Sequence, residues 1–549
     1  MNDPSLSLRS FRLGALPIID EYIDKLGICD IFARLVPADP RDKVPVWKSL
    51  GIALRNVILE RYPLYKIGGW AQSRGIINPD EADLYNDDRI GRALDRLYRS
   101  DRTAIYSSAV LKATKQYDIK IDQIHNDSTT VTLHGQYENY EDCGAAMPKH
   151  GFNKDYRPDL KQLVFSLSVT ADFAVPINFK VFDGNTSDDS THIDNWRSLR
   201  NLIGTSNFVY VADSKLCVRD TMQCINTEGG TFVTVVPETR KEISIFKDWI
   251  AENNPLWTEA INEPNPRKKD GTPRTYWVFE SPTLSAEGYR IIWVKSLQKQ
   301  LDDASRRLGR IQRTEEAIAA LNKKEYQSEE KLLAEVKSVL QMNRTKSYFE
   351  YTIVPKVEEI AKQLHPGRPN ADTSYRVIRK TTYTVVYSQI ALVVKKDACY
   401  DGIFPLITNG KSSAPEVLLT YKYQPNLEKR HEQLKSVYNV APVFIQNPQR
   451  IEAMLLLYFL AMLIASLIER DVRRKMKEDD LESVPLYPEN RKCKAPTADL
   501  IFGIFDDVRL QYIYKNKQRV SILPDALSKR QELILKLLKI KPVRYFATG

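Results

Sequence analysis

Three acidic residues stand where a folded chain could bring metal ligands together. Asp127 follows the segment IKIDQIHN, and Asp213 follows the apolar run NFVYVA. Glu428 lies far along the chain, within YKYQPNLEKRHEQLK. An acid at each of two strands and a third on a distant helix could hold two divalent cations over a phosphodiester. We therefore take Asp127, Asp213 and Glu428 as candidate catalytic residues and metal ligands.

The segment around Glu428 predicts a short helix with a charged face. Lys435 follows Glu428 by seven residues, close to two helical turns, so the two side chains share one face. The lysine could reach a phosphate as a point charge. Because proline fits only the first turn of a helix, we expect the helix to begin near Pro425. Glu432, one turn beyond Glu428, is an alternative third ligand.

The chemistry of such a site needs few protein groups. Magnesium or manganese would be held by carboxylates, with Asp127 bridging two ions and Asp213 and Glu428 each holding one. A metal lowers the pKa of bound water, so no general base is required. The six histidines show no metal-ligand spacing. Taken singly, each aspartate could equally be a cap or turn residue, and Glu428 a solvated helix residue.

The same segments resemble a known family. Tyr421, Gln424, Glu428 and Lys435 match the signature Tyr-x2-Arg-x3-Glu-x6-Lys in spacing, with glutamine in place of arginine. The segments that fit the family in its own order are IHNDSTTVTLHG, HGFNKDYRPDLKQLVFSLSV, VPINFKVFDGNTSD, FVYVADSKL and YDGIFPLITN. From about Leu16 to its C-terminus the chain resembles DDE-type bacterial insertion-sequence transposases of the IS-four superfamily.

The resemblance implies a fold, an activity and partners. It implies an RNase H-like core, two Mg²⁺ or Mn²⁺ ions, and DNA contacts by Tyr421, Gln424 and Lys435. It implies cleavage and strand transfer at terminal inverted repeats and target DNA, by a homodimer in a synaptic complex in the cytoplasm of a bacterium or archaeon. The alternatives are a nuclease of the same fold without strand transfer, and a non-catalytic DNA-binding protein derived from a transposase.

The order of expected elements supports an α/β multidomain protein with a mixed sheet flanked by helices. After about residue 119 we expect three strands, a helix, a strand, a helix and a strand, with the first and fourth strands adjacent so that Asp127 and Asp213 meet. The predicted domains are a helical DNA-end-binding or packing domain (1–118), core halves (119–237 and 399–475), an insertion (238–398) and a helical C-terminal region (476–549).

Two long segments have competing interpretations. Residues 297–340 are charged and helical, with a possible seam at Leu301, Leu308, Ile311, Ile318 and Leu321. They could form a solvated helical hairpin or an intermolecular coiled coil. Residues 498–549 predict two amphipathic helices, which could bind DNA, dimerise or brace the core.

The composition favours a soluble protein with a polyanionic partner. The net charge is +10 and the pI about 9.0, and His150, Lys154 and Arg157 lie in a basic loop that could grip DNA phosphates or be plain surface charge. Six scattered cysteines exclude a disulfide framework or zinc site. The apolar run 453–468 is short and bounded by charges, so we expect a buried helix and no membrane span.

Overall fold

The computed structural model describes residues 6–137, 144–265, 268, 270–438, 445–515 and 518–546. They form two compact units, both mixing helices and strands. The first, the core unit, combines Met1–Thr234 with Leu419–Gly549; the second, the inserted unit, is Val235–Leu418. The inserted unit runs past the predicted insertion boundary at residue 398, because strand β12 (Ile403–Thr408) pairs antiparallel with β9 (Arg290–Ser296).

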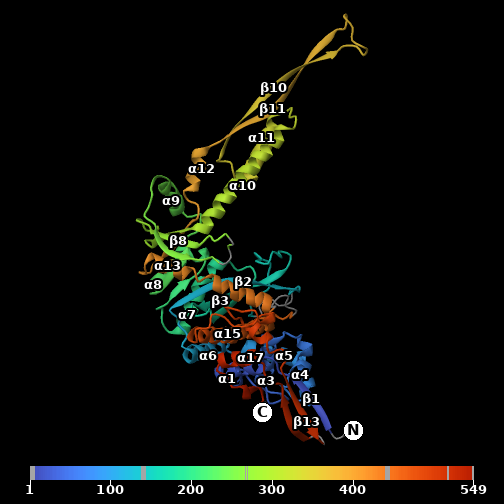
Figure 1. The fold of residues 1–549 in the computed structure, drawn as a ribbon, viewed down its shortest axis with the longest axis vertical. Helices are drawn as coiled ribbons and strands as arrows, with labels where there is room; N and C mark the ends of the chain where they lie inside the picture. The colour runs from blue at the N-terminus through green and yellow to red at the C-terminus, as the bar shows by residue number, and fades with distance from the viewer. Residues whose placement is uncertain are drawn as a thin grey trace. The chain divides into compact units, whose positions relative to one another are not determined.

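A mixed sheet lies at the centre of the core unit (Figure 1). Its strands run in the order β4-β3-β2-β5-β6, with antiparallel pairing from β4 to β2 and parallel pairing from β2 to β6. The elements are β2 (Gln123–Leu133), β3 (Lys161–Thr170), β4 (Pro176–Asp183), α7 (His192–Ile203), β5 (Val209–Val211), α8 (Arg219–Thr227) and β6 (Thr231–Val235). This confirms the predicted element order and the adjacency of the first and fourth strands.

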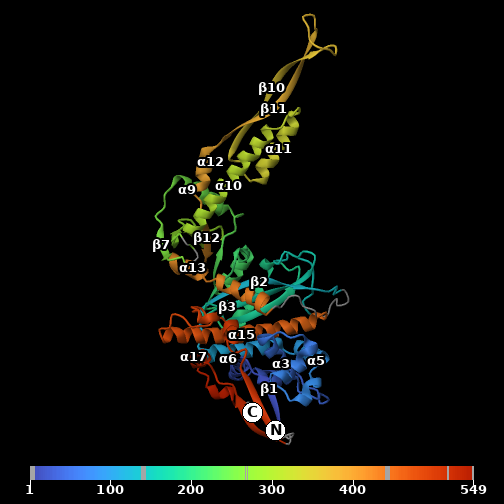
Figure 2. The same cartoon turned by 45° about the vertical axis from the view of Figure 1, so that its right-hand side comes forward.

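The apolar run 453–468 lies inside α15 (Pro448–Glu478), the longest helix of the core unit. Helix α15 contacts β4 on one side and α3 and α5 on the other, so it lies between the sheet and the N-terminal helices (Figure 2). It is long and apolar enough to cross a membrane, but 89% of its apolar window is buried in the protein. The predicted buried helix is therefore confirmed, and the structure is consistent with a soluble protein.

The N-terminal region is mostly helical, as predicted. It contains α1 (Leu16–Leu26), α2 (Ile28–Leu35), α3 (Val46–Leu59), α4 (Ile67–Ser73), α5 (Asp87–Arg99) and α6 (Arg102–Tyr117). Their apolar faces meet one another and α15, while charged residues such as those of α5 face outward. The exception is β1 (Leu6–Arg12), which precedes the first helix.

The prediction of a wholly helical C-terminal region is wrong for residues 509–524. After α16 (Ala498–Gly503) the chain forms a hairpin of β13 (Arg509–Lys515) and β14 (Gln518–Pro524), and α17 (Lys529–Leu537) follows. Strand β13 pairs antiparallel with β1, giving a three-stranded sheet. Alternating aromatic and β-branched residues in RLQYIYK favour a strand once a partner strand is present.

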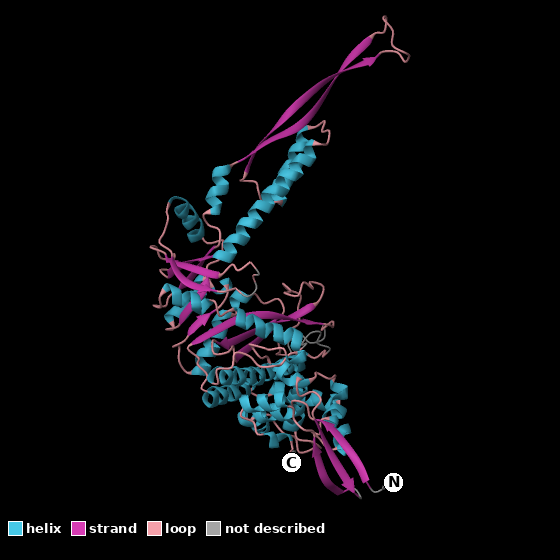
Figure 3. Ribbon diagram, viewed as in Figure 1, coloured by secondary structure: helices cyan, strands magenta, loops and turns pink. Residues whose placement is uncertain are grey.

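The inserted unit has two parts. One is a sheet of β7 (Thr258–Glu263), β8 (Arg274–Glu280), β9 and β12, with α9 (Lys241–Glu252). The other is a helical hairpin of α10 (Leu297–Asn322) and α11 (Glu329–Met342), followed by a two-stranded ribbon of β10 (Phe349–Gln363) and β11 (Tyr375–Gln389) and by α12 (Ala391–Ala398) (Figure 3). Helix α13 (Ala414–Tyr421) leads back to the core unit.

Of the two forms predicted for residues 297–340, a helical hairpin or an intermolecular coiled coil, the structure shows the helical hairpin. Ile311, Ile318 and Leu321 of α10 are buried against α11 and the base of the ribbon. Leu301 and Leu308, predicted to share this seam, are instead 49% and 64% exposed. The buried apolar seam is therefore confined to the C-terminal half of α10, where α11 and the ribbon cover it.

Candidate active site

Asp127 and Asp213 occupy matching positions on adjacent parallel strands. His125 on β2 pairs with Val211 on β5, and each aspartate lies two residues further along its own strand direction. Side chains two residues apart point to the same face, and parallel neighbours are about 4.8 Å apart. The pairing therefore brings the two carboxylates together at the end of β5, as the sequence predicts.

Asp213 also caps the turn that follows its strand. Its carboxylate accepts a hydrogen bond of 3.0 Å from the Lys215 amide at the start of η4 (Ser214–Leu216), and its carbonyl accepts one of 2.5 Å from Thr234. The expectation that this aspartate is a cap residue is therefore correct, but a capping carboxylate can still be part of a catalytic site. The cap fixes the backbone and leaves the carboxylate beside Asp127.

The pKa values of the two aspartates are shifted in opposite directions. Burial raises the pKa of Asp213; the Lys215 amide opposes this, and the charges of Asp127 and Asp188 raise the pKa further. Burial also raises the pKa of Asp127, but the hydrogen bond and charge of His431, with Lys154, bring it below its ordinary value. A carboxylate destabilised by a neighbouring carboxylate is typical of a site that binds cations.

A histidine and a lysine side chain contact Asp127. His431 Nδ1 lies 3.5 Å from Asp127 Oδ2, and Lys154 Nζ lies 3.8 Å from Oδ1. Lys154 also lies 3.3 Å from Asp188. The sequence reasoning named Lys154 but missed His431 and Asp188. The signal for His431 was its spacing of three residues from Glu428, which places both on one face of a helix.

The helix that carries Glu428 begins where the sequence predicts. Helix α14 (Pro425–Glu432) has Pro425 in its first turn and continues into a π-helical segment, η5 (Gln433–Val437). Glu428 is exposed, and three residues later His431 reaches Asp127. Lys435 Nζ lies 2.5 Å from Asp155, next to Lys154 in the predicted basic loop. One face of this helix is therefore directed toward the aspartates.

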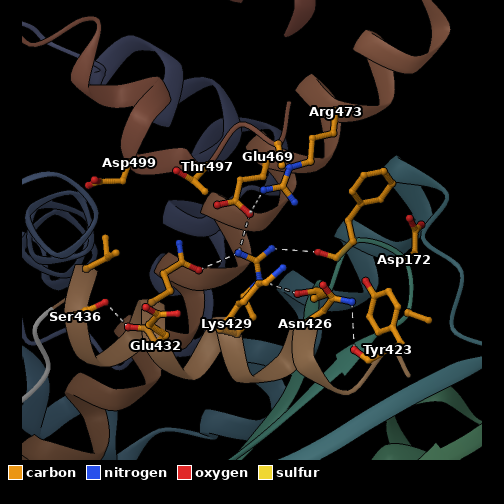
Figure 4. Close-up of a pocket in the computed structure, with 17 residues that line it drawn as sticks. Asp172, Tyr423, Asn426, Lys429, Glu432, Ser436, Glu469, Arg473, Thr497 and Asp499 are labelled. Atoms are coloured by element: carbon orange, nitrogen blue, oxygen red, sulfur yellow. Dashed lines mark hydrogen bonds and ion pairs between the residues drawn. The ribbon is translucent and has the colours of Figure 1, made fainter. Parts of the chain in front are cut away.

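Glu432, the alternative third ligand, lies on another face of α14. It lines a cavity of about 660 Å³, together with Lys429 of the same helix, Ser436 of η5 and Asp172 of the β3–β4 turn (Figure 4). Neither Asp127 nor Asp213 lines this cavity. The structure thus separates the two glutamates and favours Glu428 as the partner of the aspartates.

Gln424 and Tyr421 precede α14, as predicted; Gln424 is buried, and Tyr421, the last residue of α13, is half-buried. Gln424 Oε1 shares a hydrogen bond of 2.7 Å with His125, and Nε2 donates one of 3.2 Å to the Asn126 carbonyl. The side chain predicted to contact DNA is thus 7% exposed and holds β2 just before Asp127. Burial and the charges of Asp213, Glu428 and Asp127 raise the pKa of Tyr421 to about 12, so all three carboxylates act on one hydroxyl.

Of the three residues predicted in the basic loop, the structure brings only Lys154 to the aspartates. His150 is exposed. Arg157 is exposed and makes hydrogen bonds of 2.9 and 2.7 Å to Asp159. A DNA contact by Arg157 would therefore have to replace this pairing.

The residues present fit a divalent cation in part. Asp127 and Asp213 supply hard oxygen ligands, and a cation would offset both the burial and the neighbouring Asp127 charge that raise the pKa of Asp213. Within the described ranges, no three His, Cys, Asp or Glu side chains converge closely enough to hold a metal ion. Glu428 must therefore change rotamer to join the pair, which its exposure permits.

Comparison with protein families finds a match in the N-terminal region. Residues 8–111 match a domain of unknown function, DUF4277, a family found in transposase-like proteins. This stretch covers β1 and nearly all of the N-terminal helices and stops before the aspartates. Comparison with curated proteins gives no match.

Proposed function

We propose that the protein is a DNA transposase of the DDE type, with an RNase H-like core and the nucleotidyl-transfer site at Asp127, Asp213 and Glu428. One observation carries the proposal: two aspartates stand at matching positions of adjacent parallel strands, and the helix bearing Glu428 reaches the first through His431. The match to a domain found in transposase-like proteins supports it from a separate part of the chain.

Each residue of the site has a separate proposed role. Asp127, Asp213 and Glu428 would hold the Mg²⁺ or Mn²⁺ ions. When bound, such ions activate the attacking oxygen and stabilise the leaving oxygen of an in-line displacement. His431 orients Asp127, and Gln424 holds β2 against the loop before α14. Lys154 lies 3.8 Å from Asp127 and 3.3 Å from Asp188, and it would contact a phosphate bound beside these carboxylates.

The test uses isosteric changes that preserve packing. The variants Asp127→Asn, Asp213→Asn and Glu428→Gln, with Glu432→Gln as matched control, are incubated with Mg²⁺ or Mn²⁺ and labelled duplexes drawn from the DNA that flanks the gene. Loss of a metal ligand removes several kcal/mol of transition-state stabilisation, so we expect cleavage to fall about 1,000-fold or more. We expect Glu432→Gln to cleave normally and every variant to bind the duplex as wild type does.

Other outcomes would select the alternatives. Cleavage by wild type without joining of the 3′ end to a supercoiled target would favour a nuclease. Duplex binding without any cleavage would favour a non-catalytic DNA-binding protein. Loss of activity in Glu432→Gln with normal activity in Glu428→Gln would move the third ligand to Glu432.

A further inference from the structure

A groove lined by arginines runs along α10 in the inserted unit. It has a volume of about 690 Å³ and lies between α10 and the turn that joins α11 to β10. Its charged lining residues are four arginines and one aspartate: Arg306, Arg310, Arg313, Arg344 and Asp303. Gly309 also lines it, and no other atom lies within 4 Å of the place where a Cβ would stand, so the groove is open above the helix at this point.

Three of the arginines form one stripe on α10. Arg306, Arg310 and Arg313 are spaced by four and three residues, so their side chains share a face of the helix. Like charges at this spacing destabilise a helix, because such neighbours lie only about 5–6 Å apart. The stripe spans seven residues, about 10.5 Å of helix. Three phosphates of one DNA strand occupy about the same length along the duplex axis, at about 3.4 Å each.

The groove's positive charge is not neutralised within the protein. No acidic side chain in the described part of the chain forms an ion pair with any of the four arginines. By contrast, the neighbouring Arg307 is buried and pairs with Asp401 at 2.5 Å. Asp303 is already engaged, because it pairs with Lys299 at 2.5 Å and accepts a hydrogen bond of 3.1 Å from the Gly402 amide. The four arginines can therefore bind an anion without first breaking an ion pair.

Arg344 lines the groove from a backbone position that favours glycine. Its φ is 53°, and at this end of α11 the amides of Arg344 and Thr345 donate to the carbonyls of Gln341 and Leu340, at 3.1 and 2.9 Å. Glycine is the usual residue here because it has no Cβ. Thr345 is buried and shares a hydrogen bond of 2.9 Å with Thr314 of α10, which fixes the turn against that helix. An arginine held in this conformation beside three others is unfavourable, and a bound anion would stabilise it.

We propose that this groove binds phosphate groups, and that the phosphodiester backbone of duplex DNA supplies them. The planar guanidinium donates paired hydrogen bonds to phosphate oxygens, so arginine suits this ligand better than lysine does. The choice of DNA as the source rests on the proposed function, whereas the phosphate chemistry rests on the arginines alone. A free polyphosphate has the same chemistry and is the other source that the experiment distinguishes.

The experiment compares two triple variants of equal net charge. Arg306→Gln/Arg310→Gln/Arg313→Gln alters the stripe. Lys323→Gln/Lys331→Gln/Lys337→Gln alters three exposed lysines of the same helical hairpin that do not line the groove. Each lowers the formal charge from +10 to +7, because three positive side chains become neutral. Binding of a labelled 30-bp mixed-sequence duplex, about three helical turns, is followed by fluorescence anisotropy across a salt series. Binding of tripolyphosphate is followed by isothermal titration calorimetry.

The stripe variant should lose about 2.7 units of the log–log salt slope, since each neutralised phosphate contributes about 0.9. Its duplex affinity at low salt should fall about tenfold or more, whereas the lysine control should bind as wild type does. Arg306→Lys/Arg310→Lys/Arg313→Lys keeps the charge and should therefore retain the salt slope.

The single variant Arg344→Gly separates binding from folding. It removes one positive charge and gives the turn the residue that its backbone favours. It should resist urea at least as well as wild type does, yet lose about 0.9 units of the salt slope. An unchanged slope would contradict the proposed contact between Arg344 and phosphate.

Other results would overturn the proposal or change its source of phosphate. Normal binding of duplex and of tripolyphosphate by the stripe variant would overturn the phosphate site, while leaving cleavage at Asp127 and Asp213 a separate question. Normal duplex binding with loss of tripolyphosphate binding would overturn DNA as the source and assign the groove to a free polyphosphate. Equal loss by the stripe variant and the lysine control would show an effect of net charge and overturn the site. Failure of wild type to bind or cleave any duplex would overturn the proposed function, and tripolyphosphate binding would then decide the groove by itself.

Discussion

Replacing Arg430 tests how the candidate catalytic helix is held in place. Arg430 of α14 pairs with Glu469 of α15 at 2.8 Å, and the two side chains are 7% and 4% exposed. The same guanidinium donates to the carbonyls of Phe173 and Ala174, at 3.1 and 3.0 Å. Both of these residues have positive φ, 59° and 53°, in the turn between β3 and β4. One side chain thus joins α14, α15 and a strained turn.

The expected cost follows from the burial of the pair. In Arg430→Met, Glu469 keeps the Ala498 amide at 3.0 Å and Arg473 at 3.7 Å, but loses its closest cation. Removing one partner of a buried pair costs about 3–5 kcal/mol. The carbonyls of Phe173 and Ala174 face the 660 Å³ cavity, where water can replace the lost donors. We therefore assign no further loss of unfolding free energy to these two hydrogen bonds. We expect Arg430→Met to destabilise the core unit by about 3–5 kcal/mol.

Urea unfolding at neutral pH, followed by far-ultraviolet circular dichroism, measures this change. Lys429→Met, an exposed change on the same helix, is the control and should stay within about 0.5 kcal/mol of wild type. The double variant Arg430→Met/Glu469→Met removes both charges of the buried pair and leaves only the half-buried Arg473 without its carboxylate. Its loss of unfolding free energy should therefore be smaller than the sum of the two single losses, by about 2 kcal/mol. A single-variant loss below about 1 kcal/mol, or strict additivity, would refute this reasoning.

Three further predictions follow from buried groups. Burial, opposed by the charges of Asp127 and Asp189, lowers the pKa of His192 to about 4. The unfolded state therefore binds more protons between pH 6.5 and 4, and stability should fall by about 2 kcal/mol from pH 7 to pH 5, a loss that is smaller in His192→Gln on urea titration. Gln424→Ala should cost about 1–3 kcal/mol in the same assay, because His125 and the Asn126 carbonyl lose partners, whereas Lys429→Ala should not. The protein should stay in solution without detergent after ultracentrifugation, since α15 is an interior helix, and recovery only with detergent would contradict this.

The sequence predicted the proximity of the two aspartates because local signals and topology agree there. Asp127 lies within β2 and Asp213 follows the short apolar strand β5, and a parallel pairing of the first and fourth strands is enough to bring them together. The start of α14 was predictable from Pro425 alone. These features depend on neighbours in sequence or on one topological rule, and neither requires knowledge of distant side chains.

The failures share a dependence on distant partners. Residues 509–515 were predicted helical because their strand partner, β1, lies about 500 residues earlier in the chain. Gln424 was assigned to DNA by analogy with an arginine, but its hydrogen bonds go to His125 and Asn126, which no local pattern indicates. His431 was dismissed because it lacks metal-ligand spacing, although its role is to contact a carboxylate.

The division of the core unit into two sequence segments has a consequence during synthesis. Residues 235–418, which interrupt it, amount to 184 residues (418 − 235 + 1), or about 9 to 37 s at roughly 5–20 residues per second. Throughout that interval the apolar surfaces of α3, α5 and β4 are made but α15, which covers them, is not. The partly made core unit therefore exposes apolar surface, which is prone to aggregation, until α15 has been added. The β1–β13–β14 sheet forms later still, after residue 524 has been added.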